Sequence, residues 1–240
     1  MTSMRSIILI GVNYLRTQVL TVLIIVVYLA AMAVVFLHNP RGQESRFFVQ
    51  LHSFYVVFVA LMVAVPAIHA DRRSRRILAV LSKGIHRWEY LGGLLCGCGL
   101  VSAIFCGLVA GISWMLSQSA DYGYATSSLA GLMLMVFTCA LMASAIGLFF
   151  ATFLHPLLAT FAASATIALP LLLRQAGWNA SGSAFPTLQL AESITKFQFG
   201  DPASPGAIAT TTSTAAVVTI LFWIASALIF ARRDVTVAPE

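Results

Sequence analysis

The sequence predicts an all-α integral membrane protein with about six transmembrane helices. Of its 240 residues, 60% are hydrophobic and only 9% are charged, whereas soluble domains carry about 25% charged residues. A helix that crosses the hydrocarbon core of a bilayer needs about 20 mostly apolar residues, and about six runs in this chain meet that need. We therefore expect residues 1–240 to form a single transmembrane domain that uses the lipid bilayer as part of its solvent.

The expected spans follow from the apolar runs and from the polar segments that separate them. They are Val19–Phe36, Phe48–Ile68, Leu91–Leu116, Ser127–Phe150, Pro156–Leu173 and Ile208–Phe230. Proline lies inside two of them, at Pro66 and Pro170, where it is able to kink a helix. The even number of spans places both ends of the chain on the same side of the membrane.

Residues 4–16, ahead of the first span, are expected to form a short interfacial helix. Ile7, Val12 and Leu15 fall near one face of this helix, whereas Arg5 falls elsewhere. Amphipathic segments of this kind are typical of helices that lie in the membrane surface. The alternative is that the stretch merely extends the first span, which periodicity alone does not exclude.

The 14 Lys and Arg residues divide unequally between the two sides of the expected spans. One side holds Arg5, Arg16, Arg72, Arg73, Arg75, Arg76, Lys83, Arg87, Arg232 and Arg233; the other holds Arg41, Arg46, Arg174 and Lys196. Because cytoplasmic loops retain positive charge, we expect both termini to be cytoplasmic and the protein to lie in a bacterial inner membrane. The net charge of +6 has the same explanation, so it does not indicate nucleic-acid binding.

Small residues in the third expected span predict close helix packing. Gly93 and Gly97 are four residues apart, as are Gly107 and Gly111. Glycine pairs with this spacing let two helix backbones approach closely in lipid. We expect them to pack against a neighbouring helix, either within the chain or between subunits.

A short extracytoplasmic helix is expected between the fifth and sixth spans. It follows Pro186, within the longest polar stretch, residues 174–206. Glu192 and Lys196 are four residues apart in the order that favours an ion pair along a helix. The apolar residues of this segment recur every three positions, at Leu188, Ala191, Ile194 and Phe197.

The sequence has no motif that predicts catalysis by this chain. It contains neither a G-x-x-x-x-G-K-[ST] phosphate-binding loop nor an H-E-x-x-H metal motif, so any use of ATP would require a partner. We expect the chain not to be an enzyme. Neither a disulfide nor a metal site is expected from the thiols inside the spans, which are Cys96, Cys98, Cys106 and Cys139.

Ionisable residues are nearly absent from the expected spans. Buried charges in a membrane cost about 2.5 to 3.5 kcal/mol on insertion scales and usually mark ion or proton pathways. Only His52, His69 and His155 come near the spans, and each lies close enough to an end to face water. The sequence therefore argues against an ion-coupled carrier or a membrane enzyme.

Residues 70–90, between the second and third spans, are the most informative segment. They hold six of the 14 Lys and Arg residues. Ile77, Leu78 and Leu81 fall near one face of a first helix, and a break around Gly84 precedes a second helix. The alternative is a plain anchoring loop with interfacial aromatic residues, which explains the charge and the aromatic residues but not the apolar face.

This segment also carries a recognisable order of residues. It begins with Asp71, continues through Ile77-Leu78-Ala79-Val80-Leu81, and closes with Ser82-Lys83-Gly84-Ile85-His86-Arg87-Trp88-Glu89-Tyr90-Leu91-Gly92-Gly93. In this order, and in the exit Phe230-Ala231-Arg232-Arg233-Asp234, the chain resembles the ABC-2 type permease family. It departs from that family at Gly84, where proline is common, and at Arg75-Arg76, where members often have Gly-Thr.

The resemblance implies a cytoplasmic coupling helix that docks on a separate ABC ATPase subunit dimer. It also implies pairing with a second permease subunit, as a homodimer. Leu78 and Leu81 would anchor the partner, and the basic residues would orient it. The resemblance assigns the ATPase interface to Arg73, Arg76, Leu78, Leu81, Ser82, Lys83, Ile85, His86 and Arg87.

The expected function is export of a substrate, driven by ATP hydrolysis on the partner. No cofactor is expected in this chain, because ATP and Mg²⁺ would be bound by the ATPase subunit. The alternative is that the same scaffold transmits ATPase movements to an extracytoplasmic maturation or remodelling partner without transport. Residues 185–199 would then contact that partner, and neither interpretation identifies the substrate-binding residues.

Overall fold

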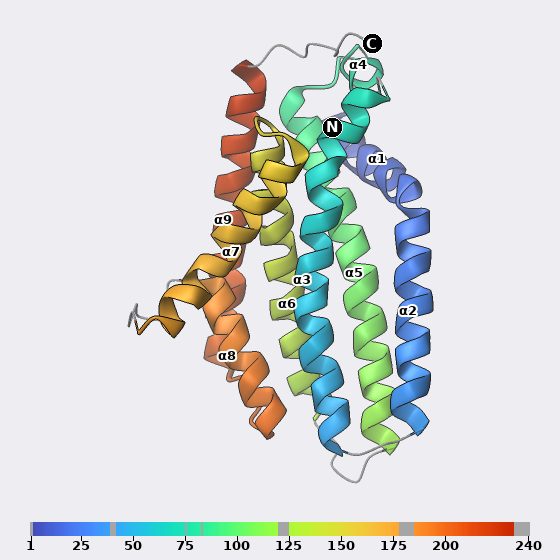
Figure 1. Cartoon of the computed structure of the whole chain (residues 1–240). Coiled ribbons are helices and arrows are strands. Elements are labelled where there is room, and N and C mark those ends of the chain that lie inside the picture. The colour runs from blue at the N-terminus through green and yellow to red at the C-terminus, as the bar shows by residue number, and fades with distance from the viewer. Residues whose placement is uncertain are drawn as a thin grey trace.

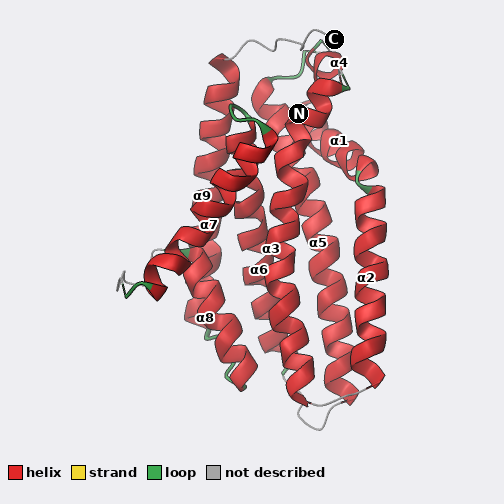
Figure 2. Ribbon diagram, viewed as in Figure 1, coloured by secondary structure: helices red, strands yellow, loops and turns green. Residues whose placement is uncertain are grey.

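The computed structural model describes residues 2–38, 42–74, 76–82, 84–119, 125–177 and 185–232. All regular secondary structure in these residues is helical (Figure 2). The helices are α1 (Thr2–Thr17), α2 (Val19–His38), α3 (Gly42–Arg73), α4 (Arg76–Leu81), α5 (Arg87–Ser119), α6 (Thr126–Ala151), α7 (Pro156–Gln175), α8 (Pro186–Phe199) and α9 (Pro205–Arg232). The all-α prediction is confirmed for this part of the chain.

Within the described residues, six helices are long and apolar enough to cross a membrane, namely α2, α3, α5, α6, α7 and α9. Each expected span lies inside one of them. The helix α3 continues past the end of its expected span as far as Arg73, and α5 begins before its expected span, at Arg87. Their apolar runs stop earlier than the helices do, because charged side chains such as arginine are good helix formers.

The helix α6 forms the centre of the bundle. It packs against α3, α5, α7, α8 and α9, and most of its length is buried. Small residues allow this packing, since a Cβ added to Gly147 would lie only 3.0 Å from Cδ1 of Leu61 in α3. By contrast, α2, α7 and α9 leave most of their apolar side chains on the surface of the bundle.

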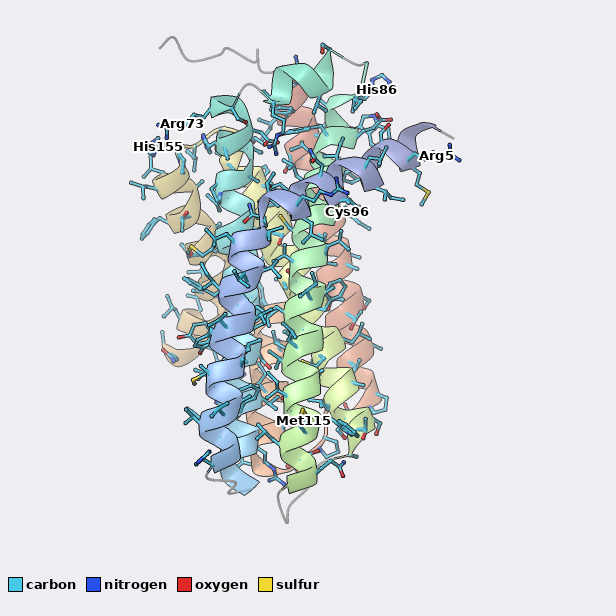
Figure 3. All side chains as sticks on the ribbon, turned by 90° about the vertical axis from the view of Figure 1, so that its right-hand side faces the viewer. Arg5, Arg73, His86, Cys96, Met115 and His155 are labelled. Atoms are coloured by element: carbon cyan, nitrogen blue, oxygen red, sulfur yellow. The ribbon has the colours of Figure 1, made fainter. Side chains whose placement is uncertain are left out.

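The helix α1 crosses α5 on the first of the two glycine pairs. A Cβ at Gly97 would lie 2.6 Å from Cδ1 of Tyr14, and a Cβ at Gly93 would lie 2.6 Å from Cβ of Ile10. Figure 3 shows Cys96, from the same stretch of α5, beside α1. The packing prediction is confirmed for this pair, whereas a Cβ at Gly107 or Gly111 would meet no described atom within 4 Å.

Tyr14 joins α1 to α3. Its hydroxyl donates a 2.7 Å hydrogen bond to the backbone carbonyl of Val63, and its side chain is only 4% exposed. A tyrosine hydroxyl is already a protonated donor at neutral pH, and burial raises the pKa of Tyr14 further. The predicted N-terminal helix is therefore present and separated from α2 by a turn at Gln18. One face of it packs on α5 through Gly11 and Tyr14, whereas Ile8 and Leu9 remain exposed.

One end of the bundle holds the features that the sequence places in the cytoplasm. Figure 1 shows the start of α1, the short α4, the turn between α6 and α7, and the last turn of α9 at this end. We call it the α4 end, and the opposite one the far end. The arrangement agrees with an even number of crossings, while the cytoplasmic location of the α4 end stays a prediction.

The helices α7 and α8 depart from the expected arrangement. In Figure 1, α7 slants away from the bundle and ends part-way along α3, and α8 runs from that level toward the far end. The predicted helix α8 is present, but it packs against α3, α6 and α9. It lies beside the spans rather than beyond their ends, with its buried apolar residues Leu188, Leu190, Ile194 and Phe197 facing the bundle.

The predicted ion pair between Glu192 and Lys196 is wrong. The Glu192 carboxylate instead pairs with the guanidinium group of Arg174. The cause is tertiary, because the end of α7 lies next to α8 and supplies a cation from another helix. The helix α8 then ends at Gly200, whose φ of 98° is the left-handed conformation that glycine adopts at low cost.

Candidate functional site

The segment that resembles a coupling helix forms a protruding hairpin at the α4 end. We call residues 71–90 the α4 hairpin; they comprise the end of α3, the single short helix α4 and the start of α5 (Figure 1). Gly84, with φ of 75°, reverses the chain between α4 and α5. Glycine reaches this left-handed conformation without steric cost. The predicted order of helix, break and helix is confirmed.

A buried carboxylate holds the base of the hairpin together. Asp71 is only 6% exposed, and its Oδ2 accepts a 2.9 Å hydrogen bond from the hydroxyl of Tyr90. Arg76, the first residue of α4, places its Nη1 3.6 Å from Oδ1 of Asp71. The Tyr90 ring in turn stacks on Phe230 of α9 at 6.0 Å. One cluster therefore links α3, α4, α5 and α9.

We expect Tyr90→Phe to destabilise the bundle by about 1 to 3 kcal/mol, because Asp71 then loses a buried hydrogen bond. The measurement is the temperature at which the buried thiols of Cys98, Cys106 and Cys139 react with a thiol dye. The matched control is Tyr55→Phe, since Tyr55 is 42% exposed. Equal transition temperatures for the two variants would contradict the role of this hydrogen bond.

The start of α5 is capped by its own side chain. The buried Glu89 carboxylate accepts a 3.2 Å hydrogen bond from the backbone N–H of His86, the residue that precedes the helix. This is the glutamate half of a capping box, which satisfies an N–H group that a helix otherwise leaves unpaired. The cap gives the second arm of the hairpin a defined starting point.

Arg87 connects the hairpin to the last turn of α9. Its Nη1 donates to the backbone carbonyls of Phe230 at 2.6 Å and Ala231 at 3.0 Å. The guanidinium carbon also lies 5.8 Å from the centre of the Phe230 ring. A cation at this position is favourable, because the carbonyls at a helix C-terminus lack intrahelical partners and carry partial negative charge.

The structure divides the predicted ATPase-interface residues into two groups. Arg76 and Arg87 bind groups of the chain itself, and Ile85 is half-buried. Arg73, Ser82 and His86 are exposed, and Figure 3 shows Arg73 and His86 at opposite edges of the α4 end. Lys83 lies outside the described residues, as do the side chains of Leu78 and Leu81.

The apolar face of α4 is partly used within the chain. Ile77, which the sequence places near the same face as Leu78 and Leu81, is only 1% exposed. It therefore anchors α4 to the bundle rather than to a partner. Ile77 is buried because α4 packs on the end of α3.

The three histidines near the ends of the spans, His52, His69 and His155, differ in exposure more than the sequence predicts. His155 is exposed, whereas His69 is half-buried with its Nε2 3.1 Å from the carbonyl oxygen of Leu154. The two rings lie 6.4 Å apart, which joins α3 to the turn between α6 and α7. This contact gives the hairpin base a further link to the bundle.

His52 does not face water, contrary to the sequence-based interpretation. It is fully buried in α3 among aromatic rings, with Tyr28 at 5.6 Å and Phe48 at 4.0 Å between ring centres. Its Nδ1 lies 2.7 Å from the Phe48 carbonyl, and among the described residues its Nε2 has no hydrogen-bond partner. No sequence signal distinguishes such a histidine from one at a helix end.

Residues that sequence reasoning missed are Tyr90 and Glu89 as internal partners, and Phe230 as the surface on which Arg87 rests. The spacing of His86 and Glu89 was a usable signal for the cap. No family model matches this sequence, and no curated protein matches it. The role of the α4 hairpin is therefore inferred from its geometry.

Proposed function

We propose that this chain is the permease subunit of an ABC-2 type exporter. It pairs with a second copy of itself, and a separate ATPase docks on the α4 hairpin and drives outward movement of a substrate. The observation that carries the proposal is a chain of contacts at the base of the α4 hairpin. Asp71 of α3 binds both Arg76 of α4 and Tyr90 of α5, and Arg87 at the start of α5 binds the last turn of α9.

This geometry suits the transmission of movement. A docked partner that displaces α4 pulls on Asp71 through Arg76, and Asp71 is buried at the base of α3. The same displacement reaches α9, because Arg87 at the start of α5 holds the last carbonyls of that helix. The hydrogen bond between Tyr90 and Asp71 at the centre of this chain of contacts is buried and therefore costly to break, so it holds α3 and α5 together as α4 moves.

The alternative function receives less support from the structure. It requires α8 to contact an extracytoplasmic maturation or remodelling partner. However, the apolar side chains of α8 are buried against the bundle, including Leu190 and Ile194. Among its described apolar residues, Phe199 is strongly exposed, at 77%. A helix whose apolar face is already covered is a poor docking surface, which favours the exporter.

The docking proposal predicts that a double variant, Leu78→Asp with Leu81→Asp, loses its ATPase. Two carboxylates on α4 would have to be desolvated in the interface, which costs several kcal/mol. We expect at least a tenfold loss of ATP hydrolysis in material purified through a tag on the full-length chain. The amount of chain in the membrane should stay unchanged.

The matched control is Leu157→Asp, because Leu157 is 77% exposed on α7 near the same end but lies outside the α4 hairpin. It should retain the co-purified ATPase. If the double variant also retains it, α4 is not the docking site. If no ATPase accompanies the unaltered chain, the exporter proposal itself fails.

A further inference from the structure

An apolar cavity of about 260 Å³ lies between α3, α7 and α8. Its lining includes Phe58, Leu61, Ile167, Leu171, Thr187 and Leu190. Phe58 is also 52% exposed on the surface of the bundle, so the mouth opens toward the apolar surroundings of the spans. The volume is just below the range of about 300 to 1,000 Å³ for small-molecule sites, so the cavity suits a hydrocarbon chain better than a bulky ring system.

The lining face of α7 leads to a charged residue. Ser164, Ile167 and Leu171 line the cavity, and Arg174 follows Leu171 by three residues. Positions three or four apart share one face of a helix. A molecule that lies along this face therefore meets apolar side chains first and a guanidinium group at the end.

A second, more polar hollow lies where α7 ends against α8. Its volume is about 440 Å³, and it is lined by Arg174, Ala191, Glu192, Thr195 and Lys196. Glu192 is paired with Arg174, whereas the exposed Lys196 has no ion-pair partner among the described residues. Two cations and one carboxylate leave a positive excess, which suits a phosphate or carboxylate ligand.

The polar hollow lies at the end of α7. Figure 1 shows that α7, of which Arg174 is the penultimate residue, ends part-way along α3 rather than beyond its end. Charged side chains inside a membrane are costly and usually face a water-filled or ligand-binding cavity. A ligand that extends from the apolar cavity along α7 therefore meets the cationic side chains at the end of that helix.

We propose that the two hollows together bind an anionic amphiphile. Its hydrocarbon chain occupies the cavity between α3, α7 and α8, and its phosphate or carboxylate lies between Lys196 and Arg174. The molecule reaches the cavity from the bilayer, because the cavity mouth opens on the surface of the spans. The claim that this amphiphile is the exported substrate rests on the proposed function. The claim that the chain binds it does not require the ATPase.

The test uses the full-length chain in phosphatidylcholine nanodiscs without any ATPase. Binding of dodecyl phosphate is compared with binding of dodecyltrimethylammonium and of inorganic phosphate. We expect dodecyl phosphate to bind at least tenfold more tightly than either. Equal affinity of the two dodecyl compounds would overturn the role of the cations, and equal affinity of inorganic phosphate would show a free-anion site instead.

Two variants separate the proposal from loss of folding. Lys196→Gln should weaken dodecyl phosphate about fivefold to tenfold, whereas Arg16→Gln, which removes a charge from exposed α1, should not. Glu192→Gln should strengthen it, because Arg174 is released from its internal partner. A misfolded protein does not gain affinity for dodecyl phosphate, so tighter binding by Glu192→Gln is not explained by loss of folding. The proposal would be overturned if neither Lys196→Gln nor Glu192→Gln changed the affinity.

The outcome is independent of the docking test. The double variant at Leu78 and Leu81 should bind dodecyl phosphate normally while losing its ATPase. Normal binding in a chain that never co-purifies with an ATPase would retain the amphiphile site and remove the exporter. A chain that retains its ATPase but does not prefer dodecyl phosphate would retain the exporter proposal and remove the amphiphile site.

Discussion

Gly97→Leu is expected to separate α1 from α5. A Cβ at this position already lies 2.6 Å from Cδ1 of Tyr14 and 3.0 Å from the carbonyl oxygen of Gly11, so a larger side chain has no room unless α1 moves. We expect a destabilisation of about 3 kcal/mol, in the upper part of the range for overpacked interiors. The hydrogen bond from Tyr14 to Val63 would be lost with the same movement.

Cross-linking measures this separation directly. In a Gly11→Cys background, the new Cβ would lie 3.1 Å from Sγ and 3.2 Å from Cβ of Cys96. A small outward shift gives the Cβ separation of about 3.5 to 4.5 Å that disulfides have. Oxidation should therefore join α1 to α5 in that background and should fail when Gly97→Leu is added.

Gly107→Leu is the matched control, because a Cβ at Gly107 meets no described atom within 4 Å. It should leave both the cross-link and the thermal stability of the chain unchanged. A cross-link that persists equally in the Gly97→Leu protein would contradict the close crossing of α1 and α5.

Arg87→Ala is expected to uncouple ATP hydrolysis from movement of the bundle. The carbonyls of Phe230 and Ala231 lose their charged donor, and charge-assisted hydrogen bonds contribute about 1.5 to 3 kcal/mol when well shielded. We expect amide hydrogen exchange in the last turn of α9 to accelerate about tenfold, which corresponds to about 1.4 kcal/mol. Transport per ATP hydrolysed should fall, while the ATPase remains bound.

Two comparisons make this result specific. Arg87→Lys keeps the charge but lacks the planar fork of donors, so it should restore only part of the protection of α9. Arg73→Ala removes an exposed arginine at the same end and should weaken the ATPase without changing hydrogen exchange in α9. If Arg87→Ala behaves like Arg73→Ala, then Arg87 is a docking residue and not a link between helices.

The helices themselves were largely predictable from local sequence. Each apolar run became a helix, because a backbone in lipid must satisfy its own hydrogen bonds. The break at Gly84 and the helix after Pro186 were also readable, since glycine and proline restrict the local backbone in known ways. The largest differences in helix length are at α3 and α5, where charged residues continue the helix.

The site was less predictable than the fold. Sequence reasoning placed Arg87 among residues that orient a partner, yet its guanidinium binds α9, about 140 residues later in the chain. It paired Glu192 with Lys196 because they share a helix, whereas Arg174 from α7 lies closer. The Arg87 contact with α9 and the Arg174–Glu192 pair were missed for one reason: a local pattern shows which side chains share an element, but not which element lies opposite. The role of Arg87 in docking stays a prediction.

The sequence alone thus determined that this chain is a helical membrane protein with a basic hairpin between its second and third spans. Composition and apolar run length suffice for that, because they set the solvent that each segment requires. Only the tertiary structure decided that Asp71 is buried against Tyr90, and that α7 and α8 bring Arg174 and Lys196 to one hollow. Such contacts depend on how helices pack, and helix packing depends on side chains that are distant in sequence.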